Sequence, residues 1–478
     1  MLEKPVLKMK TELGQFMTPE GIARFMASMY PNSDLQVCDL LDAGAGKGAL
    51  SSAFVDRFLN QNGGFRFNTL NVHTYEIDSS LYEAHREKLA EYSGINLYPH
   101  NDDFIKAAAI KALQGGRKFS HAILNPPYKK MNTDSEHRQL VRAVGLETVN
   151  LYTAFVALAL ELLRPHGILV AIIPRSFCNG PYYKPFREFI LKRSAIRRIH
   201  LFGARDKAFK EDGVLQENII IMLEREAEQG DIELSLSTDA SFSDLSFKRV
   251  QFSDVVPSVF DEKFICIPTG AGGSSANHFG RVNASLKDIG VAVSTGPVVD
   301  FRLKDFLRPM PGEDTVPLLY PTHFQNNLLH WPLPVSKKPN AIVFNGYTEK
   351  WLYPAGTYCV VRRFSSKEEK RRIVANVVES ADLPDSSMFG FENHLNVFHI
   401  NKNGMAKELA YGLSLYLNST LADEYFREFS GHTQVNATDL RQMKYPTREV
   451  LIELGKWVIT QQEFDQHALD QQLERLIA

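Results

Sequence analysis

The sequence predicts an α/β protein with a mostly parallel sheet, followed by a second domain of the α+β class. Three observations support this prediction. Strand-like and helix-like segments alternate through the first half of the 478-residue chain. The alternation ends near residue 224, at a polar stretch rich in glycine, serine and aspartate. Short segments, prolines and loops follow, so we expect two domains, over 1–237 and 238–478.

The helices predicted in the first half alternate with its predicted strands. Apolar residues at helical spacing predict helices over 18–30, 49–60 and 79–92. The first of these begins with Thr-Pro, in which the threonine can cap the helix and the proline can occupy its first position. A long apolar run predicts a further helix over 151–167, which a proline and a glycine end.

The predicted strands are short runs of apolar and β-branched residues. Strands that alternate with helices form a mostly parallel sheet with both faces covered. Ligands of such sheets bind at the carboxyl ends of the strands, which meet at one edge. The strands are predicted over 37–46, 71–78, 95–104, 119–128, 167–174, 196–203 and 217–224.

Composition excludes few classes of protein. The 54 lysines and arginines nearly balance 56 acidic residues, so a nucleic-acid binder would need a local basic face. The four cysteines are far apart and form no CxxC pair, so neither a metal site nor a disulfide framework is predicted. The N-terminus lacks the apolar region of a signal peptide, and no apolar run is long enough to cross a membrane. We expect a soluble, cytoplasmic protein.

A glycine-rich turn, LLDAGAGKGAL, lies between a predicted strand and a predicted helix. Such a turn lets a ligand approach the backbone closely, and both phosphates and adenosine-type cofactors use it. The turn is not a P-loop, because Leu41 stands where that motif has its first glycine and Gly48 stands where it needs serine or threonine. A tight structural turn is the alternative. We expect the Lys47 side chain to point to solvent.

Acidic residues stand at neighbouring strand ends. Glu76 ends the next strand, and its two carboxylate oxygens can accept from both hydroxyls of a ribose. After the third strand, the carboxylate of Asp103 can accept from an adenine amine while the Phe104 ring packs against the base. Taken alone, that last pair is better explained as a surface carboxylate beside a core ring. Together with Asp42, the three strand ends favour a cofactor site.

The sequence Asn125-Pro126-Pro127-Tyr128 ends the fourth predicted strand at the same edge of the sheet. Two prolines fix φ and remove two N–H donors. The amide carbonyl of Asn125, backbone carbonyls and the Tyr128 ring remain. An acceptor-rich pocket beside an aromatic ring suits a flat molecule with an exocyclic NH2 group. A turn with a purely structural role is the alternative.

These motifs together resemble those of gamma-class N6-adenine DNA methyltransferases of restriction–modification systems. NPPY resembles the catalytic motif of that family, DAGAGKG and YEID resemble its S-adenosylmethionine motifs, and GQFMTPEGIARFM resembles the preceding segment. The order of cofactor motifs, catalytic motif and recognition domain is the same. The resemblance covers residues 11–225, and a weaker one covers 418–446.

The resemblance implies a Rossmann-like S-adenosylmethionine-dependent methyltransferase domain over 1–237 and an α+β target-recognition domain with C-terminal helices over 238–478. In the catalytic motif, Asn125 and Pro126 would hold the amine of an adenine flipped out of duplex DNA. The motif is completed by Pro127 and Tyr128, and the tyrosine would stack on the base. The residues implied to bind S-adenosylmethionine are Thr18, Asp42, Gly44, Gly46, Gly48, Glu76, Ile77, Asp103 and Phe104.

A second aromatic residue would stack on the flipped base. In the family it lies in a loop before the last strands of the sheet, which favours Phe209 here, with Phe202 as the second choice. Packing beneath the loop is the alternative for Phe209. No metal is needed for the transfer.

Double-stranded DNA is the expected partner, and basic residues are the candidates for contacts with its phosphates. We expect a monomer that acts on the same site as a cognate restriction endonuclease. Solvated helix faces are the alternative explanation of the basic residues. The candidates are Lys184, Arg187, Lys192, Arg193, Arg197, Arg198, Arg362, Arg363, Lys367, Lys370, Arg371 and Arg372, with His323, Gln325, Asn326 and Asn327 as candidate base readers.

Other functions remain open at this point. NPPY also occurs in RNA and protein-glutamine methyltransferases, although the large second domain argues against a glutamine substrate. A non-catalytic DNA-specificity protein is a third alternative, against which the glycine turn, Glu76 and NPPY all argue. Asparagine rather than serine at position 125 favours adenine over the N4 amine of cytosine.

Overall fold

The chain divides into two compact units, Met1–Ile267 and Pro268–Ala478. This division lies C-terminal of the boundary predicted at 237/238. The reason is that β9 (Ser246–Val250) pairs antiparallel with β8 (Ile232–Ser237) and so extends the sheet of the first unit. The computed structural model describes residues 17–32, 35–59, 67–203, 217–258, 261–268, 282–325, 328–335, 337–365, 369–383, 386–430, 434–461 and 463–478.

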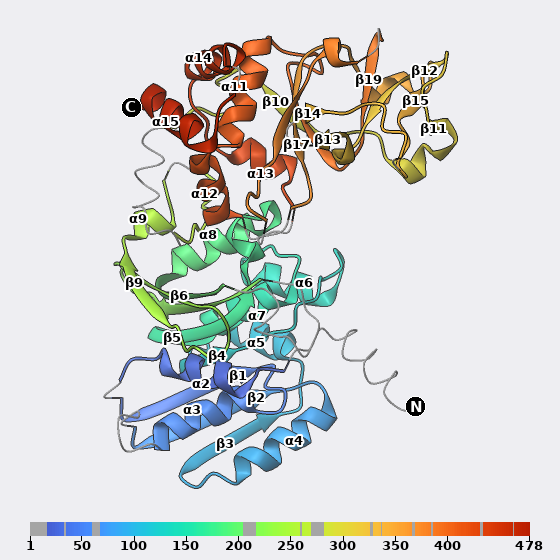
Figure 1. Cartoon of the computed structure of the whole chain (residues 1–478). Coiled ribbons are helices and arrows are strands. Elements are labelled where there is room, and N and C mark those ends of the chain that lie inside the picture. Colours follow the sequence, from blue (N-terminus) through green and yellow to red (C-terminus); the bar gives the residue numbers. More distant parts are fainter. Residues whose placement is uncertain are drawn as a thin grey trace. The chain divides into compact units, whose positions relative to one another are not determined.

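The first unit is built on one sheet whose strands have the order β3-β2-β1-β4-β5-β7-β6-β8-β9 in the described part of the chain (Figure 1). Strands β1 to β5 pair in parallel, as predicted, whereas β7 runs antiparallel to both of its neighbours. The remaining bounds are β1 Val37–Ala43, β2 Thr69–Tyr75, β3 Ile95–His100, β4 Phe119–Leu124, β5 Leu163–Pro174, β6 Ser194–Phe202 and β7 Asn218–Arg225.

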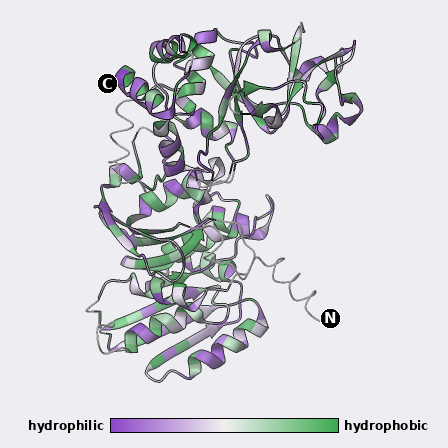
Figure 2. Cartoon of the chain, in the orientation of Figure 1, coloured by the Kyte–Doolittle hydropathy of each residue, from purple (hydrophilic) through white to green (hydrophobic). Residues whose placement is uncertain are grey.

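Helices cover both faces of this sheet, because its central strands are apolar on both sides (Figure 2). One apolar core joins the sheet to α2, α3 and α4, and another joins it to α5, α6, α7 and α8. The bounds are α2 Glu20–Ser28, α3 Ala49–Leu59, α4 Ser79–Ala90, α5 Phe104–Leu113, α6 Glu136–Ala143, α7 Leu151–Leu162, α8 Lys184–Arg193 and α9 Phe252–Val255.

The second unit combines small sheets with a group of helices, as the α+β prediction expects. Its strands have the orders β10-β20-β17-β18, β11-β15-β12-β19-β16 and β13-β14 in the described residues. The strand bounds are β10 Ala292–Thr295, β11 Leu307–Arg308, β12 Thr315–Leu319, β13 Phe324–Gln325, β14 Leu328–Leu329, β15 Ala341–Val343, β16 Leu352–Pro354, β17 Tyr358–Arg362, β18 Ala375–Val378, β19 Met388–Phe391 and β20 Leu395–His399. The helix bounds are α11 Lys407–Leu417, α12 Thr420–Phe429, α13 Ala437–Gln442, α14 Arg448–Ile459 and α15 Gln466–Ile477.

Two glycines bring α11 and α14 into backbone contact. A Cβ atom on Gly412 would lie 1.8 Å from the carbonyl oxygen of Leu451, and one on Gly455 would lie 1.8 Å from that of Glu408. No other residue type fits at either position unless the helices move apart.

Within the described residues, no helix combines the length and the apolar character that a membrane span requires. The same residues contain no group of three or more histidine, cysteine, aspartate or glutamate side chains placed to bind a metal.

Candidate active site

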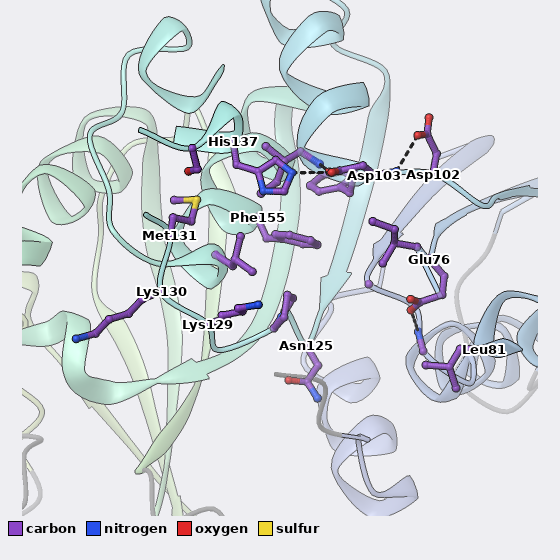
Figure 3. A pocket seen from close by; sticks show the side chains of 18 of the residues that line it. Glu76, Leu81, Asp102, Asp103, Asn125, Lys129, Lys130, Met131, His137 and Phe155 are labelled. Atoms are coloured by element: carbon purple, nitrogen blue, oxygen red, sulfur yellow. Dashed lines mark hydrogen bonds and ion pairs between the residues drawn. The ribbon is translucent and has the colours of Figure 1, made fainter. Parts of the chain in front are cut away.

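A cavity of about 350 Å³ lies at the carboxyl ends of β1, β2, β3 and β4 in the first unit (Figure 3). It brings together many of the residues predicted from the sequence: Gly44, Gly46, Glu76, Ile77, Asp103, Phe104, Asn125 and Pro127. A smaller hollow of about 230 Å³ shares Gly44, Gly46 and Asn125 with this cavity and adds Thr18 and Lys47 to its lining. The predicted convergence of strand ends therefore produces one continuous site.

The glycine turn opens the backbone to this site. Gly44, Gly46 and Gly48 have φ values of 77°, 55° and 76°, a left-handed conformation that favours glycine. The first two line the cavity. Gly48 lies outside the lining, and a Cβ atom there would be 3.0 Å from the Cβ of His85, so this glycine permits close packing of α4.

Backbone N–H groups hold the carboxylate of Glu76. Its Oε2 accepts from the N–H of Gly46 at 2.9 Å, and its Oε1 accepts from the N–H of Asp78 at 2.9 Å. Burial raises the pKa of Glu76 despite these bonds. A carboxylate oxygen can accept more than one hydrogen bond, so the predicted contact with the hydroxyls of a ribose is compatible with this geometry.

Asp103 is held in a similar way at the start of α5. Its Oδ1 accepts from the N–H groups of Ile105 at 3.0 Å and Lys106 at 3.4 Å, which caps the helix. Its Oδ2 contacts Nε2 of His137 at 2.6 Å, and this histidine, from α6, also lines the cavity (Figure 3). Burial acts to raise the pKa of Asp103, but His137 and the backbone donors outweigh it and lower the pKa. The same hydrogen bond raises the pKa of His137.

One side chain from a distant segment and one from the same motif contact the amide of Asn125. Its Nδ2 donates to Oγ1 of Thr18 at 2.8 Å, and its Oδ1 accepts from the hydroxyl of Tyr128 at 3.2 Å. That hydroxyl also contacts the carbonyl oxygen of Ile172 at 3.3 Å. Tyr128 is half-buried and does not line the cavity, and burial raises the pKa of its hydroxyl. Pro126 is buried behind Asn125.

Asp42 lies beneath the site rather than in its lining. Its Oδ2 accepts from the backbone N–H and the hydroxyl of Ser51, at 3.2 and 2.6 Å. Its Oδ1 is buried and has no hydrogen-bond partner among the described residues. Burial raises the pKa of this carboxyl group to about 7. Lys47 is exposed, as expected, and borders the smaller hollow.

Phe209 and Phe202 were the two candidates for the second ring that stacks on the flipped base. Phe209 lies outside the described residues, so its role stays a prediction. Phe202 is wrong as the second choice, because it is 3% exposed in β6 and packs against His200 and Phe242.

Several predicted DNA contacts are also wrong. Arg187 is fully buried and donates to the carbonyl oxygens of Phe177, Gly180 and Glu262, while Arg372 is 1% exposed. His323 is buried and bonded to Asn340, so it does not present its ring to a base. Five further candidates are partly exposed, and their role in DNA contact stays a prediction. They form ion pairs within their own unit: Lys184 with Glu262, Arg193 with Glu161, Arg197 with Glu224, Arg198 with Glu233, and Arg362 with Glu369. Lys367, Asn326 and Asn327 lie outside the described residues.

Among the lining residues that sequence reasoning missed are His137, Phe155 and Lys129. Phe155 lies in the long apolar helix α7, where nothing distinguishes it from core residues, and its ring centroid is 5.1 Å from that of Phe104. The Lys129 side chain points into the cavity, whereas that of Lys130 points away (Figure 3). In the sequence, the pair of lysines directly after NPPY was the feature that could have indicated Lys129 as a residue of the site.

The lining fits a nucleoside cofactor. Ile77, Phe104 and Phe155 supply apolar and aromatic surface, and the carboxylates of Glu76 and Asp103 supply acceptors for hydroxyl and amine groups. The glycine turn exposes its main chain to the cavity, so a cofactor can approach the backbone closely there. This fold and this cavity define an S-adenosylmethionine-dependent methyltransferase.

Comparison with a solved structure supports the fold. The type IIL restriction-modification enzyme MmeI, solved in complex with DNA, gives a TM-score of 0.52 at 10% identity, and the match covers 100% of this chain and 73% of MmeI. At that identity the likeness shows the fold alone.

Comparisons of sequence show the family. Residues 25–209 match the Eco57I restriction-modification methylase family. The type II methyltransferase M.BsuBI of Bacillus subtilis is 51% identical to this chain, over 99% of this chain and 95% of M.BsuBI. M.PstI of Providencia stuartii is 40% identical, over 97% of this chain and 92% of M.PstI. The chain belongs to the type II methyltransferases of restriction–modification systems, and its cofactor is S-adenosylmethionine.

Proposed function

We propose that the protein transfers a methyl group from S-adenosylmethionine to the N6 amine of an adenine flipped out of duplex DNA, at a specific site. The position of Asn125 carries this proposal. This residue lines the cavity beside the glycine turn, and a Cβ atom on Gly44 would lie 3.9 Å from the backbone carbonyl oxygen of Asn125. The residue proposed to hold the amine and the glycine turn are therefore neighbours.

The adenine amine is a weak nucleophile because its lone pair is delocalised into the ring. Asn125 Oδ1 and the carbonyl oxygen of Pro126 accept its two hydrogens, which favours a tetrahedral nitrogen and stabilises the charge that develops on it. The nitrogen lone pair forms the new N–C bond as the bond from the methyl carbon to sulfur breaks. S-adenosylmethionine, when bound, would supply the activated methyl group, and its sulfur would keep the electron pair of the broken bond. The methylated nitrogen would then release one proton to solvent.

The roles proposed for the remaining residues follow the geometry of the site. Glu76 accepts from the ribose of the cofactor and Asp103 from its adenine, beside Ile77 and Phe104. Gly44 and Gly46 offer open backbone, and Thr18 borders the hollow next to them. Asp42 and Gly48 support the turn from below, through Ser51 and His85.

The proposed substrate is DNA, read by the second unit as a target-recognition domain. The asparagine at position 125 favours adenine over cytosine. The proposed protein is a monomer that acts in the cytoplasm. Its proposed partner is a cognate restriction endonuclease, which cuts the same DNA site when that site is unmodified. An RNA adenine methyltransferase is the alternative with the same catalytic motif.

Expression in a host without its own methylases tests the proposal. Sequencing that maps modified bases should find N6-methyladenine in one short DNA motif and no N4-methylcytosine. Binding to duplex DNA should exceed binding to structured RNA in a filter assay. Modified cytosine, or methylated RNA with unmodified DNA, would contradict the proposal.

The variant Asn125→Ala tests the residue assignment. It should lower the rate of methyl transfer by roughly 100- to 1000-fold, as expected when one preorganised group at the reacting atom is lost. Binding of S-adenosylhomocysteine, measured by calorimetry, should stay within a few-fold of the wild type and serves as the folding control. Near-normal transfer would exclude the proposed role of this amide.

A further inference from the structure

The orientation of the Asn125 amide decides whether it can do the proposed chemistry. An amide presents a carbonyl oxygen at one side and an NH2 group at the other. With Oδ1 toward the target, it accepts from the adenine amine. Rotated by half a turn, it would place its own hydrogens against those of the amine. The side-chain torsion of asparagine that exchanges the two is broad, so neighbouring groups must select one orientation.

Two hydroxyl groups are among the groups that contact this amide, and their distances from it differ. The hydroxyl of Tyr128 has a single proton but faces two carbonyl acceptors, Asn125 Oδ1 at 3.2 Å and Ile172 O at 3.3 Å. Like the hydroxyl of Thr18, it can donate or accept, so the chemical type of the two hydroxyls does not distinguish them and the shorter contact restrains the amide more. The bond from Asn125 Nδ2 to Thr18 Oγ1 is shorter, at 2.8 Å.

The chain around Thr18 holds its hydroxyl in place. Pro19 follows directly, and a residue before proline is restricted to extended conformations. The carbonyl of Pro19 accepts the N–H of Ala23, so α2 starts immediately behind Thr18. Ile22 and Met26 of that helix are fully buried in the core beneath the sheet. A helix anchored in the core therefore sets the position of the hydroxyl that contacts the catalytic amide.

We infer that Thr18 is a positioning residue of the transfer reaction, which turns Asn125 Oδ1 toward the target amine by accepting a hydrogen bond from Nδ2. This inference rests on the proposed function and goes beyond the cofactor contact assigned to Thr18. A cofactor contact alone would affect cofactor affinity. A positioning role affects the rate of transfer at saturating cofactor.

Thr18→Val and Thr18→Ser form a matched pair of variants. Valine keeps the shape of threonine but removes the acceptor, whereas serine keeps the hydroxyl. Single-turnover transfer to unmethylated DNA from a methylase-deficient host, at saturating S-adenosylmethionine, should fall roughly 10-fold for Thr18→Val, the equivalent of one hydrogen bond. Thr18→Ser should restore most of the rate. Because the cofactor is saturating, a change in cofactor affinity does not enter this rate, and calorimetry with S-adenosylhomocysteine measures that change separately as a Kd.

The reverse pattern overturns the inference. If Thr18→Val raises the Kd and leaves the saturated rate unchanged, Thr18 is a cofactor contact only. An unchanged rate together with an unchanged Kd overturns it as well, as does a rate that Thr18→Ser fails to restore.

A double-mutant cycle shows whether Thr18 acts through Asn125. In the Asn125→Ala background, measured with enzyme in excess of DNA, Thr18→Val should cause no further loss. An equal further loss would mean independent action and would overturn the inference. Failure of the proposed function looks different: the wild type would then make no N6-methyladenine, or Asn125→Ala would retain full activity.

Discussion

The two sides of the cavity hold their hydrogen-bond acceptors in different ways. On the cofactor side, Glu76 and Asp103 each accept two backbone N–H groups from residues close to a strand end or a helix start. On the catalytic side, the amide of Asn125 contacts the hydroxyls of Thr18 and Tyr128. Backbone N–H groups hold the acceptors proposed to bind the cofactor, whereas side chains contact the acceptor proposed for catalysis. Affinity and rate should therefore respond to different substitutions.

Glu76→Ala should have the largest effect and should act on the cofactor side. It removes a carboxylate with two proposed charged hydrogen bonds, so the Kd for S-adenosylhomocysteine should rise by roughly 100-fold or more. It also leaves the N–H groups of Gly46 and Asp78 without their acceptor, which should lower the free energy of unfolding by about 1–3 kcal/mol. Calorimetry and denaturant unfolding measure the two effects. If Glu76→Ala left the affinity for S-adenosylhomocysteine unchanged and lowered the rate of methyl transfer, the proposed difference between the two sides would be wrong.

Tyr128→Phe should have a smaller effect and should act on the catalytic side. The ring stays, while the hydroxyl that contacts Asn125 and Ile172 is lost. The saturated transfer rate should fall roughly 3- to 10-fold, as for a single neutral hydrogen bond, with little change in the cofactor Kd. Quenched single-turnover assays measure the transfer rate, and calorimetry measures the cofactor Kd. A larger effect on Kd than on rate would place the tyrosine on the cofactor side.

The contact between His137 and Asp103 should give the smallest effect, a dependence of stability on pH. The pKa of His137 is raised, so its contribution is complete below its ordinary value of about 6.5 and is lost as pH rises through the higher folded value. The pKa of Asp103 is lowered, so its contribution is present above about 3.9 and is lost only as pH falls through a value below that. Lys106 and Glu136 face the pair and form an ion pair of their own.

The variant His137→Gln tests this contact. Because the pair is partly exposed, the wild type should lose less than about 1 kcal/mol of unfolding free energy as pH rises from 6 to 9, relative to the variant. Lys106→Gln, which removes the neighbouring ion pair, should keep the wild-type dependence. Identical pH profiles for the wild type and His137→Gln would contradict the assignment of the raised pKa to this contact.

The sequence predicts one side of the site better than the other, for a physical reason. The ends of parallel strands meet at one edge, so Gly44, Glu76 and Asp103 could be placed together from the pattern alone. His137 comes from α6, a short and mostly polar helix, and its contact with Asp103 depends on how α5 and α6 pack. The bond between Thr18 and Asn125 joins segments 107 residues apart, and no local pattern encodes it.

The same reasoning explains the errors about basic residues. Arg187 stands in a helix with other charged residues, which is typical of a solvated face, but it donates to the backbone of Glu262, far along the chain. Only the folded positions of both partners reveal that such an arginine is structural. Strands β1 to β7 and helices α2, α3, α4 and α7 of the first unit were predicted because periodicity is local, whereas the helices α5, α6, α8 and α9 and the strands β8 and β9 were missed.

The contact between α11 and α14 has a consequence for redesign of the second unit. A Cβ atom on Gly412 or Gly455 would overlap a carbonyl oxygen of the facing helix, so at these two positions main chain packs directly on main chain. The distance between the two helices is therefore limited by the main chain at these points. Redesign of this unit should keep both glycines, because any larger residue there would push the helices apart.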